Sequence, residues 1–226
     1  MVRGEKDYTQ RMSAAMRRAG IHGDKVLFID DFEALTLKIT DSAGAGTYTL
    51  TTAAGTVWNG DQALSMNPTA NNLLRVMRTF PLPTPSILSA EFIALPSTLS
   101  VSYINLGFDI YTGTHRLSAI FGVSTESGNV IIRYYDSNGD WQTLYTYNSP
   151  DLPQAWHYFF MQFDMISQSY RVLQFDNRRF TLKDTGVGST VNPFPSSGTL
   201  FIDIKNSTGV TGSLYVDDLT LSYEEP

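Results

Sequence analysis

Residues 155–182 read AWHYFFMQFDMISQSYRVLQFDNRRFTL, and this stretch decides the fold. Side chains of an extended strand point alternately to its two faces. Between residues 157 and 163 both faces would be largely apolar: one would carry Tyr158, Phe160 and Gln162, and the other His157, Phe159, Met161 and Phe163. A strand that is apolar on both faces belongs in the middle of a packed sheet. Asp164 and the polar residues after it predict a hairpin, and a second strand follows over 170–176.

The same alternation extends outward from this hairpin in both directions. Further strand-like runs cover 26–40, 47–52, 73–80, 86–95, 101–111, 116–124, 129–136, 141–147, 179–184, 198–205 and 212–223. Turn-forming clusters separate many of them, such as DSAGAG at 41–46, DSNGD at 136–140 and NSTGVTG at 206–212. Four glycines fall at or near predicted turns, where a positive φ is useful: Gly113, Gly122, Gly128 and Gly139. Short strands at regular spacing, with no helical crossover between them, predict an antiparallel sandwich or barrel.

The N-terminal residues differ from the rest because they predict a helix over 7–19 (DYTQRMSAAMRRA). Asp7 can cap its start, and Arg17 and Arg18 suit the negative end of the helix dipole. An apolar stripe at four-residue spacing lies along this helix: Tyr8, Met12 and Met16. Three interpretations stay open: the stripe packs on the protein's own sandwich, the arm is partly disordered, or the stripe docks on another subunit.

Three patches of the sequence resemble the concanavalin A-like, or laminin G-like, jelly rolls and their carbohydrate-binding-module relatives. FIDDFE at 28–33 resembles an opening strand, the hairpin of 155–182 resembles the paired central strands, and LYVDDLTL at 214–221 resembles the closing strand. The resemblance implies an all-β, antiparallel jelly-roll β-sandwich over 26–226, preceded by a short N-terminal helical arm over 1–25. It also implies that the first and last strands lie side by side. Jelly rolls host unrelated functions, so the resemblance specifies a fold rather than a function.

The composition excludes several classes of site. The chain has no cysteine, so disulfides, zinc ribbons and thiol nucleophiles are excluded. Residues 1–25 hold six basic and three acidic side chains, whereas the remainder holds ten basic and nineteen acidic ones. An acidic sandwich argues against nucleic-acid binding, and no apolar stretch approaches the roughly 20 residues of a membrane span. No apolar signal-peptide core follows Arg3 and Lys6, so we expect a virion or cytoplasmic protein.

Two acidic pairs would meet if the first and last strands are neighbours. They are Asp30-Asp31, with Glu33 close by, and Asp217-Asp218. Carboxylates are the hard oxygen ligands that calcium prefers, and the resemblance implies a structural calcium held by Asp30, Glu33 and Asp217. Adjacent strand residues point to opposite faces, so only one of each pair can serve a given site. The alternative is a set of solvated edge charges that discourage edge-to-edge pairing.

No arrangement of residues indicates catalysis, and we predict that the protein is not an enzyme. The sequence lacks the closely spaced acidic residues, E-x-D-x-x-E, that glycoside hydrolases of this fold carry on one strand. Asp164 and Asp176 are the pair that a hairpin could bring together, although both fall in predicted turns. His157, on an apolar strand, is expected to be a packed core residue. The DSNGD loop lacks the bidentate Glu of an EF-hand, because position 147 is Tyr, and a hairpin turn explains it better.

A sugar-binding site would need exposed aromatic side chains, which stack on pyranose faces beside amides and carboxylates. Trp58, in TVWNGDQ, and Trp141, in NGDWQT, lie in polar, turn-like contexts. Tyr145 and Tyr147, with Tyr111, are predicted to join them. The alternative is that each Trp buries its ring and finds a partner for its N–H group.

Three functions fit these observations. The first is a non-enzymatic structural or assembly protein of a particle, such as a bacteriophage capsid decoration or a tail or baseplate component, whose arm docks on other protein subunits. The second is a carbohydrate-binding module that recognises a polysaccharide, and the third is a glycan-cleaving enzyme, for which the expected carboxylates are absent. We favour the first. It is compatible with glycan binding, because a virion protein can use a lectin-like fold to contact host glycans.

Deleting residues 1–20 tests the predicted arm. We expect the truncated chain to keep the cooperative melting of the sandwich but to lose assembly, because the arm supplies the contact with a neighbouring subunit. Light scattering on the size-exclusion peaks of the full and truncated chains measures this. A defined oligomer that becomes a monomer on truncation confirms the prediction. Loss of the sandwich's own melting transition, or two identical monomers, contradicts it.

Overall fold

The computed structural model describes residues 25–30, 32, 39, 41–82, 87–98 and 101–224. The helix predicted over 7–19 lies outside this part of the chain, as do all the residues of its proposed assembly surface: Tyr8, Met12, Met16, Arg17 and Arg18. Every regular element within the described part is a β-strand, as the sequence predicts. None of the described residues forms a helix of the length and apolarity that crossing a membrane requires.

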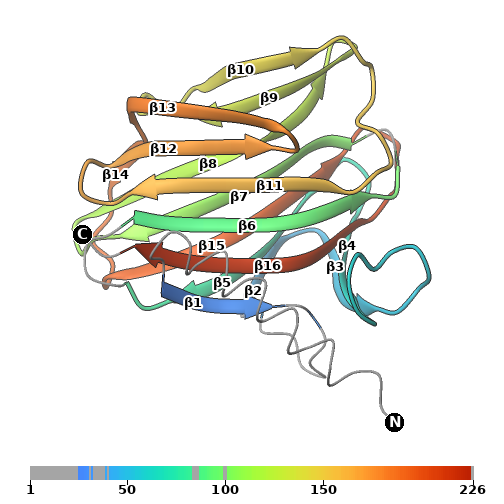
Figure 1. The fold of residues 1–226 in the computed structure, drawn as a ribbon, viewed down its shortest axis with the longest axis horizontal. Helices are drawn as coiled ribbons and strands as arrows, with labels where there is room; N and C mark the ends of the chain where they lie inside the picture. The colour runs from blue at the N-terminus through green and yellow to red at the C-terminus, as the bar shows by residue number, and fades with distance from the viewer. Residues whose placement is uncertain are drawn as a thin grey trace.

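The strands of the described chain form two antiparallel sheets, which pack face to face (Figure 1). Sheet A contains, in spatial order, β13 (Arg178–Gly186), β12 (Ser169–Phe175), β11 (His157–Asp164), β6 (Ile87–Pro96), β16 (Leu214–Glu224), β4 (Ala63–Pro68) and β3 (Gly46–Thr51), and β1 (Lys25–Asp30) also pairs with β16. Sheet B contains β10 (Trp141–Tyr147), β9 (Asn129–Tyr135), β8 (His115–Glu126), β7 (Val101–Tyr111), β15 (Ser197–Asn206), β5 (Leu73–Phe80) and β2 (Asp41–Gly44), and β14 (Gly188–Val191) also pairs with β8. The architecture is the predicted β-sandwich.

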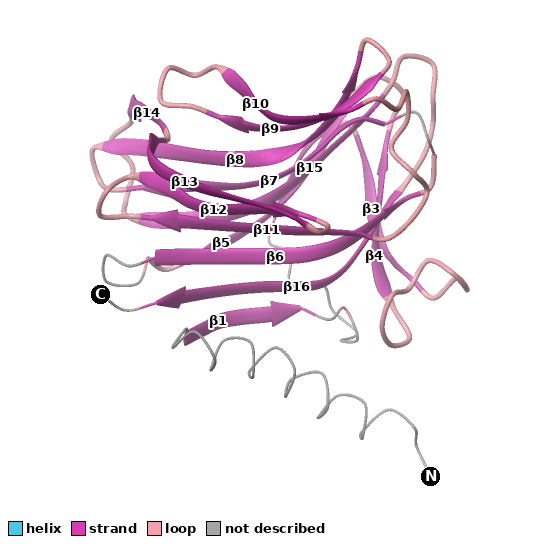
Figure 2. Ribbon diagram, turned by 45° about the horizontal axis from the view of Figure 1, so that its top comes forward, coloured by secondary structure: helices cyan, strands magenta, loops and turns pink. Residues whose placement is uncertain are grey.

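The core lies between the two sheets, where alternate side chains of the strands meet. Figure 2 shows the long strands of both layers joined by loops. Sheet A contributes the buried side chains of Phe92, Phe159 and Phe163, and sheet B those of Phe108 and Phe121. The rings of Phe92 and Phe159 stack with their centroids 4.6 Å apart. Each fully buried side chain of this size stabilises the fold by about 1.5–3 kcal/mol, so this apolar layer holds the two sheets together.

The stretch 155–182 forms the hairpin that the sequence predicts. β11 lies between β12 and β6, so it is a central strand of sheet A. One of its two apolar faces is buried, with His157, Phe159, Met161 and Phe163, whereas the positions on the other face are half-buried. The closing strand β16 pairs with β1, which confirms that the first and last strands are neighbours.

The cluster DSAGAG at 41–46 is not the simple turn that the sequence predicts. Its first four residues form β2 at the edge of sheet B, and Gly46 begins β3 of sheet A, so the chain passes from one sheet to the other at Ala45. Gly44 has a φ of 93°, and a Cβ atom there would lie 2.0 Å from the carbonyl oxygen of Leu73. Only glycine fits such a corner.

The glycines predicted at turns divide into two groups. Three of them have positive φ angles in turns: Gly113, Gly128 and Gly139. The prediction for Gly122 is wrong, because this residue lies in the middle of β8. A Cβ atom at Gly122 would stand 2.4 Å from the side-chain oxygen of Asn105 in β7, so the glycine makes room for that amide.

β8 changes its outer partner part-way along its length. Residues 121–126 pair with β9 and residues 115–118 with β14, and Ile120 lies between the two ladders. Tyr170 of β12 reaches across the sandwich to this point: its hydroxyl accepts a hydrogen bond from the Ile120 N–H (2.7 Å) and donates to the carbonyl oxygen of Tyr135 (2.7 Å). Burial raises the pKa of Tyr170, which keeps the hydroxyl protonated and able to donate. One side chain therefore satisfies backbone groups that a continuous strand would otherwise pair.

Replacing Tyr170 by Phe tests this role. We expect Tyr170→Phe to lower the free energy of unfolding by about 1–3 kcal/mol, because it leaves buried backbone groups without a partner while keeping the ring. Urea unfolding followed by tryptophan fluorescence measures the change. Tyr215→Phe, at a half-buried tyrosine of β16, is the matched control, and equal losses in the two variants would contradict the prediction.

Candidate functional site: the polar face of sheet B

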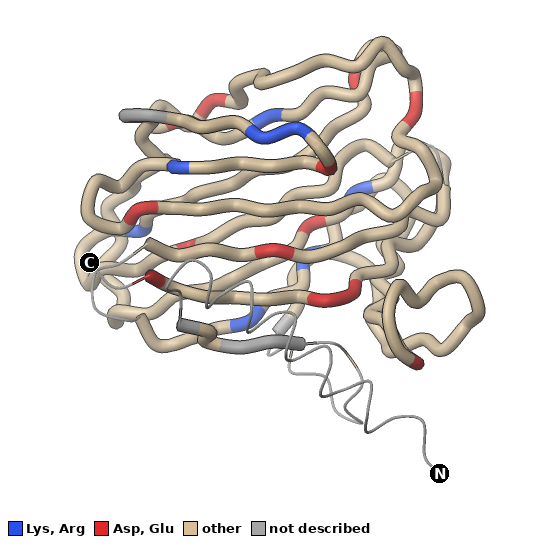
Figure 3. Tube along the Cα trace, viewed as in Figure 1, with Lys and Arg blue, Asp and Glu red and all other residues tan. Residues whose placement is uncertain are grey.

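A row of polar residues crosses the outer face of sheet B. Cross-strand pairing places Arg75 of β5 opposite Asp203 of β15, then Asn105 of β7, Gly122 of β8 and Arg133 of β9. The residues between them along each strand belong to the buried core, so the row points away from it. Figure 3 shows charged residues of both signs interspersed over the described sheets. The strand register thus brings these polar residues side by side on one face of the sheet.

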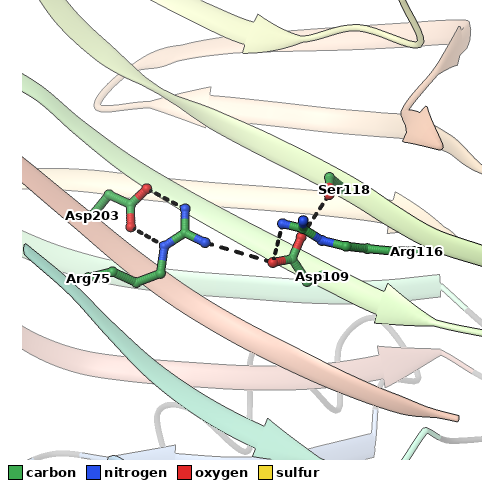
Figure 4. Close-up of polar contacts among 5 residues, drawn as sticks. All are labelled: Arg75, Asp109, Arg116, Ser118 and Asp203. Atoms are coloured by element: carbon green, nitrogen blue, oxygen red, sulfur yellow. Dashed lines mark hydrogen bonds and ion pairs between the residues drawn. The ribbon is translucent and has the colours of Figure 1, made fainter. Parts of the chain in front are cut away.

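Two arginines of this face are bound to two buried aspartates (Figure 4). Arg75 Nε and Nη2 donate to the two carboxylate oxygens of Asp203 at 2.6 and 2.8 Å, and Arg75 Nη1 lies 3.8 Å from Asp109. Asp109 also accepts from Arg116 (2.8 Å) and from the Ser118 hydroxyl (2.7 Å). Burial lowers the pKa of Arg75, but its hydrogen bond to Asp203 and the nearby negative charges raise that pKa on balance. We call the following set the polar face: Arg75, Asn105, Asp109, Arg116, Ser118, Gly122, Arg133 and Asp203.

An aromatic ring supports this network. The Arg75 guanidinium lies 3.7 Å from the ring centroid of Phe201, which is buried although it lies outside the core cluster. Gly107 stands opposite Phe201 in β7, and a Cβ atom at Gly107 would lie 2.1 Å from that ring. The glycine leaves room for the ring, and the ring fixes the guanidinium by a cation–π contact worth about 0.5–2 kcal/mol. The charged groups are thus held in place before any ligand arrives.

Arg133 has a different environment from the other two arginines. Its guanidinium lies 4.1 Å from the ring centroid of Trp141 and 5.8 Å from that of Tyr103. Its carboxylate partner is Glu126, whose side chain is 52% exposed. Burial lowers the pKa of Arg133, and Glu126 offsets this only in part. Trp141 packs edge-on against Tyr135 and stays 38% exposed at the margin of the polar face.

The structure does not bring the four predicted sugar-binding residues together. Alternation would put Trp141, Tyr145 and Tyr147 on one face, but a β-bulge after Thr143 shifts the register and reverses the face. Trp141 therefore borders the polar face, whereas Tyr145 and Tyr147 pack against the core and contact each other, with ring centroids 4.8 Å apart. Arg178 of β13 donates to both tyrosine hydroxyls, at 2.9 and 3.2 Å. These two tyrosines link the edge strands of the two sheets.

Trp58 belongs to a separate aromatic pair. It lies in the loop between β3 and β4, is 53% exposed, and has its ring centroid 5.7 Å from that of Trp156, just before β11. Tyr111, at the end of β7, packs against Phe194 at 5.7 Å. The predicted aromatic residues therefore occupy several places, and Trp141 is the one that adjoins the polar face.

β16 changes its partner at a bulge between Asp217 and Thr220. Before the bulge β16 pairs with β4, and after it with β1. Asp217 is fully buried, and its Oδ2 accepts hydrogen bonds from the N–H groups of Trp58 (3.1 Å) and Asn59 (3.0 Å), while its Oδ1 accepts from Asp218 (2.8 Å). This carboxylate anchors the loop that carries Trp58.

The hydrogen bonds of Asp217 matter for the predicted calcium site, because Asp217 is one of its three predicted ligands. Both oxygens of Asp217 face backbone N–H donors, which suits an isolated anion and does not favour a cation ligand. Within residues that the structure describes, no cluster of three or more acidic, His or Cys side chains could hold a metal ion. The side chain of Asp30 and the whole of Glu33 lie outside that description. Calcium binding stays a prediction from the resemblance.

The acidic pair considered for catalysis does not meet. Asp164 ends β11, whereas Asp176 accepts a hydrogen bond from the N–H of Tyr158 at the start of the same strand. The hypothesis that they approach one another is wrong because they lie at opposite ends of β11. His157 is buried, as expected, with Nδ1 2.9 Å from Asp176 and Nε2 2.9 Å from the carbonyl oxygen of Pro153.

No local motif in the sequence marks the charged residues of the polar face. Four of the five stand within otherwise largely apolar strands: Arg75 in LLRVMRTF, Asp109 in NLGFDIY, Arg133 in NVIIRYY and Asp203 in LFIDIK. Charged residues are rarely buried unless they are paired. A charge at an outward position of an apolar strand is therefore the signal that could have indicated them.

Comparison with known proteins establishes the fold. No family model matches the sequence, and the curated proteins contain no significant match. Among solved structures, the conserved carbohydrate esterase of the Shiga toxin-encoding bacteriophage phi24B aligns with a TM-score of 0.60 at 14% identity, covering 90% of this chain and 100% of that chain. A chain from the endo-acting O-glycanases that human gut microbiota express to initiate mucin breakdown gives 0.53 at 10% identity, with 89% and 100% covered. Lectin I-B4 from Griffonia simplicifolia gives 0.51 at 11% identity, with 88% and 99% covered. The chain therefore has the lectin-like jelly-roll fold predicted from the sequence.

The buried carboxyl of Asp217 predicts a pH dependence of stability. Burial raises the pKa of Asp217 to about 7, against the opposing effect of the backbone amides. An acid whose pKa is higher in the folded state binds its proton more tightly there, so its contribution to stability falls as the pH rises from its ordinary pKa toward about 7. We expect this loss to reach about 1.4 kcal/mol per pH unit at most, and to be absent in Asp217→Asn. Urea unfolding at pH 5, 6 and 7 compares the two slopes, and parallel profiles would contradict the prediction.

Proposed function

We propose that the protein is a non-catalytic carbohydrate-binding protein, and that its polar face, with Trp141 at the margin, contacts the sugar. The observation that carries this proposal is the combination of fixed charged and amide groups with an exposed indole on one sheet face. Sugar hydroxyls both donate and accept hydrogen bonds, so they match a surface that offers an amide and guanidinium donors held in place by buried carboxylates. An aromatic ring offers a flat apolar surface to the C–H face of a pyranose.

The rigidity of this face supports recognition. Arg75 is fixed by Asp203 and by the Phe201 ring, and Arg116 is fixed by Asp109. A ligand that binds to such groups loses little free energy in ordering them, because they are already in position. Preorganised polar groups beside an aromatic side chain are what a binding protein needs for specificity toward hydroxyl-rich ligands.

A binding role fits the carboxylates better than a catalytic role. Glycoside hydrolysis uses one carboxylic acid and one carboxylate, with separations of about 5 Å or somewhat more, on either side of the scissile bond. On the polar face Asp109 and Asp203 are both engaged by arginines, which leaves neither available to exchange a proton with a substrate. Two enzymes that act on glycans share the fold. This is compatible with a binding role here, because one fold hosts different activities.

The virion role expected from the sequence stays a proposal beside this one. A bacteriophage protein shares the fold over 90% of this chain, which supports a phage-associated role. Assembly through residues 1–25 is a separate proposal, and the truncation experiment tests it. A glycan-binding face and an assembly arm are compatible in one chain, because they use different parts of it.

Substitution of Trp141 tests the glycan-binding proposal. We expect the full chain to be retained by at least one polysaccharide in affinity electrophoresis, and Trp141→Ala to weaken that binding about tenfold or more, equivalent to about 1.4 kcal/mol. Trp58→Ala is the matched control, because it removes another exposed indole, which belongs to a different cluster. Thermal melting verifies that both variants fold. Loss of retention in Trp58→Ala alone would place the site elsewhere, and no retention across a broad glycan panel would reject the proposal.

A further inference from the structure

In the described part of the chain, three buried polar atoms without a hydrogen-bond partner lie together around Gly122. They are Asn105 Oδ1, Ser124 Oγ and Arg133 Nε. Asn105 and Arg133 are the cross-strand neighbours of Gly122, and Ser124 lies two residues further along β8 on the same face. The side chains of Asn105 and Ser124 are more than nine-tenths buried. Buried polar atoms nearly always have partners, so a group of unpartnered ones on one sheet face points to a ligand.

Arg133 is the arginine of this face whose counter-charge a ligand can replace. Arg75 donates twice to Asp203, a carboxylate that is only 5% exposed. Glu126, in contrast, is more than half exposed and stands at the end of β8 beside the turn to β9. Glu126 is the exposed partner of this pair, so water can hydrate its carboxylate when another carboxylate takes its place beside Arg133. The Arg133 side chain, which is 12% exposed, would then pair with the incoming carboxylate beside the exposed indole of Trp141.

We propose that Arg133 anchors a subsite for the carboxylate of an acidic sugar, in which the ligand displaces Glu126 and the sugar ring packs beside Trp141. This inference rests on the proposed glycan-binding function and names its ligand class as uronic or sialic acid glycans. Glu126 occupies the position of the ligand carboxylate in the free protein. Asn105, opposite Gly122 in β7, and Ser124, two residues after Gly122 in β8, supply the hydrogen-bonding groups for sugar hydroxyls.

The chemistry of the guanidinium favours a carboxylate over a neutral group. Arginine presents planar donors that match the two oxygens of a carboxylate, and such charge-assisted bonds are about twice as strong as neutral ones. The burial that lowers the pKa of Arg133 also keeps it poorly hydrated, which strengthens an ion pair formed there. A ligand carboxylate in place of the exposed Glu126 can also form both hydrogen bonds with the guanidinium.

Matched acids and esters test the proposal by calorimetry. The probes are trigalacturonic acid, 3′-sialyllactose and the methyl ester of each, so that each pair differs only in the charge. We expect the protein to bind at least one acid about tenfold more tightly than its ester. Arg133→Gln should abolish that preference, and Glu126→Gln should strengthen binding of the acid by about threefold without changing that of the ester, because it removes a competing carboxylate.

Arg171→Gln is the matched control, because it removes the same charge from an exposed position of β12 in the other sheet. It should leave the preference for the acid unchanged. Glu126→Gln changes an exposed residue, so it keeps the test decisive even if Arg133→Gln does not fold. Equal binding of acids and esters, or an unaltered preference in the Arg133 and Glu126 variants, would overturn the inference. If neutral glycans bind and that binding depends on Trp141, the inference fails while the proposed function stands.

Discussion

The fold depends on satisfying backbone polar groups at two points where a strand changes partner. β8 passes from β9 to β14, and the hydroxyl of Tyr170 binds the backbone of Ile120 between the two ladders. β16 passes from β4 to β1, and the carboxylate of Asp217 binds the amides of the neighbouring loop. An unpaired backbone group inside the protein costs as much as a lost hydrogen bond. These two side chains therefore allow each sheet to use more strands than one continuous ladder could pair.

The same ladders place the functional groups. Strand register aligns Arg75, Asp203, Asn105, Gly122 and Arg133 across five strands, although they are far apart in sequence. A shift of one residue in any of these strands would turn its polar side chain into the core. The apolar core that fixes the register thus also fixes the polar face. The bulge in β10 shows what such a shift does. Its one extra residue puts Trp141 and the two tyrosines that follow on opposite faces of the sheet.

The sequence predicts those features that depend on local alternation, and it misses those that depend on pairing. The apolar faces around Phe159 identify a central strand without any knowledge of its neighbours. The DSNGD hairpin turn, closed by the Gly139 N–H to the Asp136 carbonyl, follows from turn chemistry alone. The sequence does not indicate that Gly122 lies within β8. A glycine in a strand is explained here only by its pairing with Asn105, whose side chain needs the space. The polar face was missed for the same reason: its members are single charges in five strands, and a one-dimensional pattern carries no information about which strands are adjacent.

The three arginines of the polar face differ in their partners. Two of them are paired with buried carboxylates of the protein, and the third, Arg133, is not. Asp203 for Arg75 and Asp109 for Arg116 are carboxylates on neighbouring strands, almost fully buried, and removing either would leave an uncompensated charge. Arg133 has no buried carboxylate beside it: the facing position in β8 is Gly122, and its ion-pair partner among the described residues is the exposed Glu126 at the end of the same strand. A folded protein gains little stability from burying a guanidinium that is compensated so weakly, since burial alone lowers its pKa. The position of this arginine beside an exposed indole is therefore consistent with the proposed ligand site.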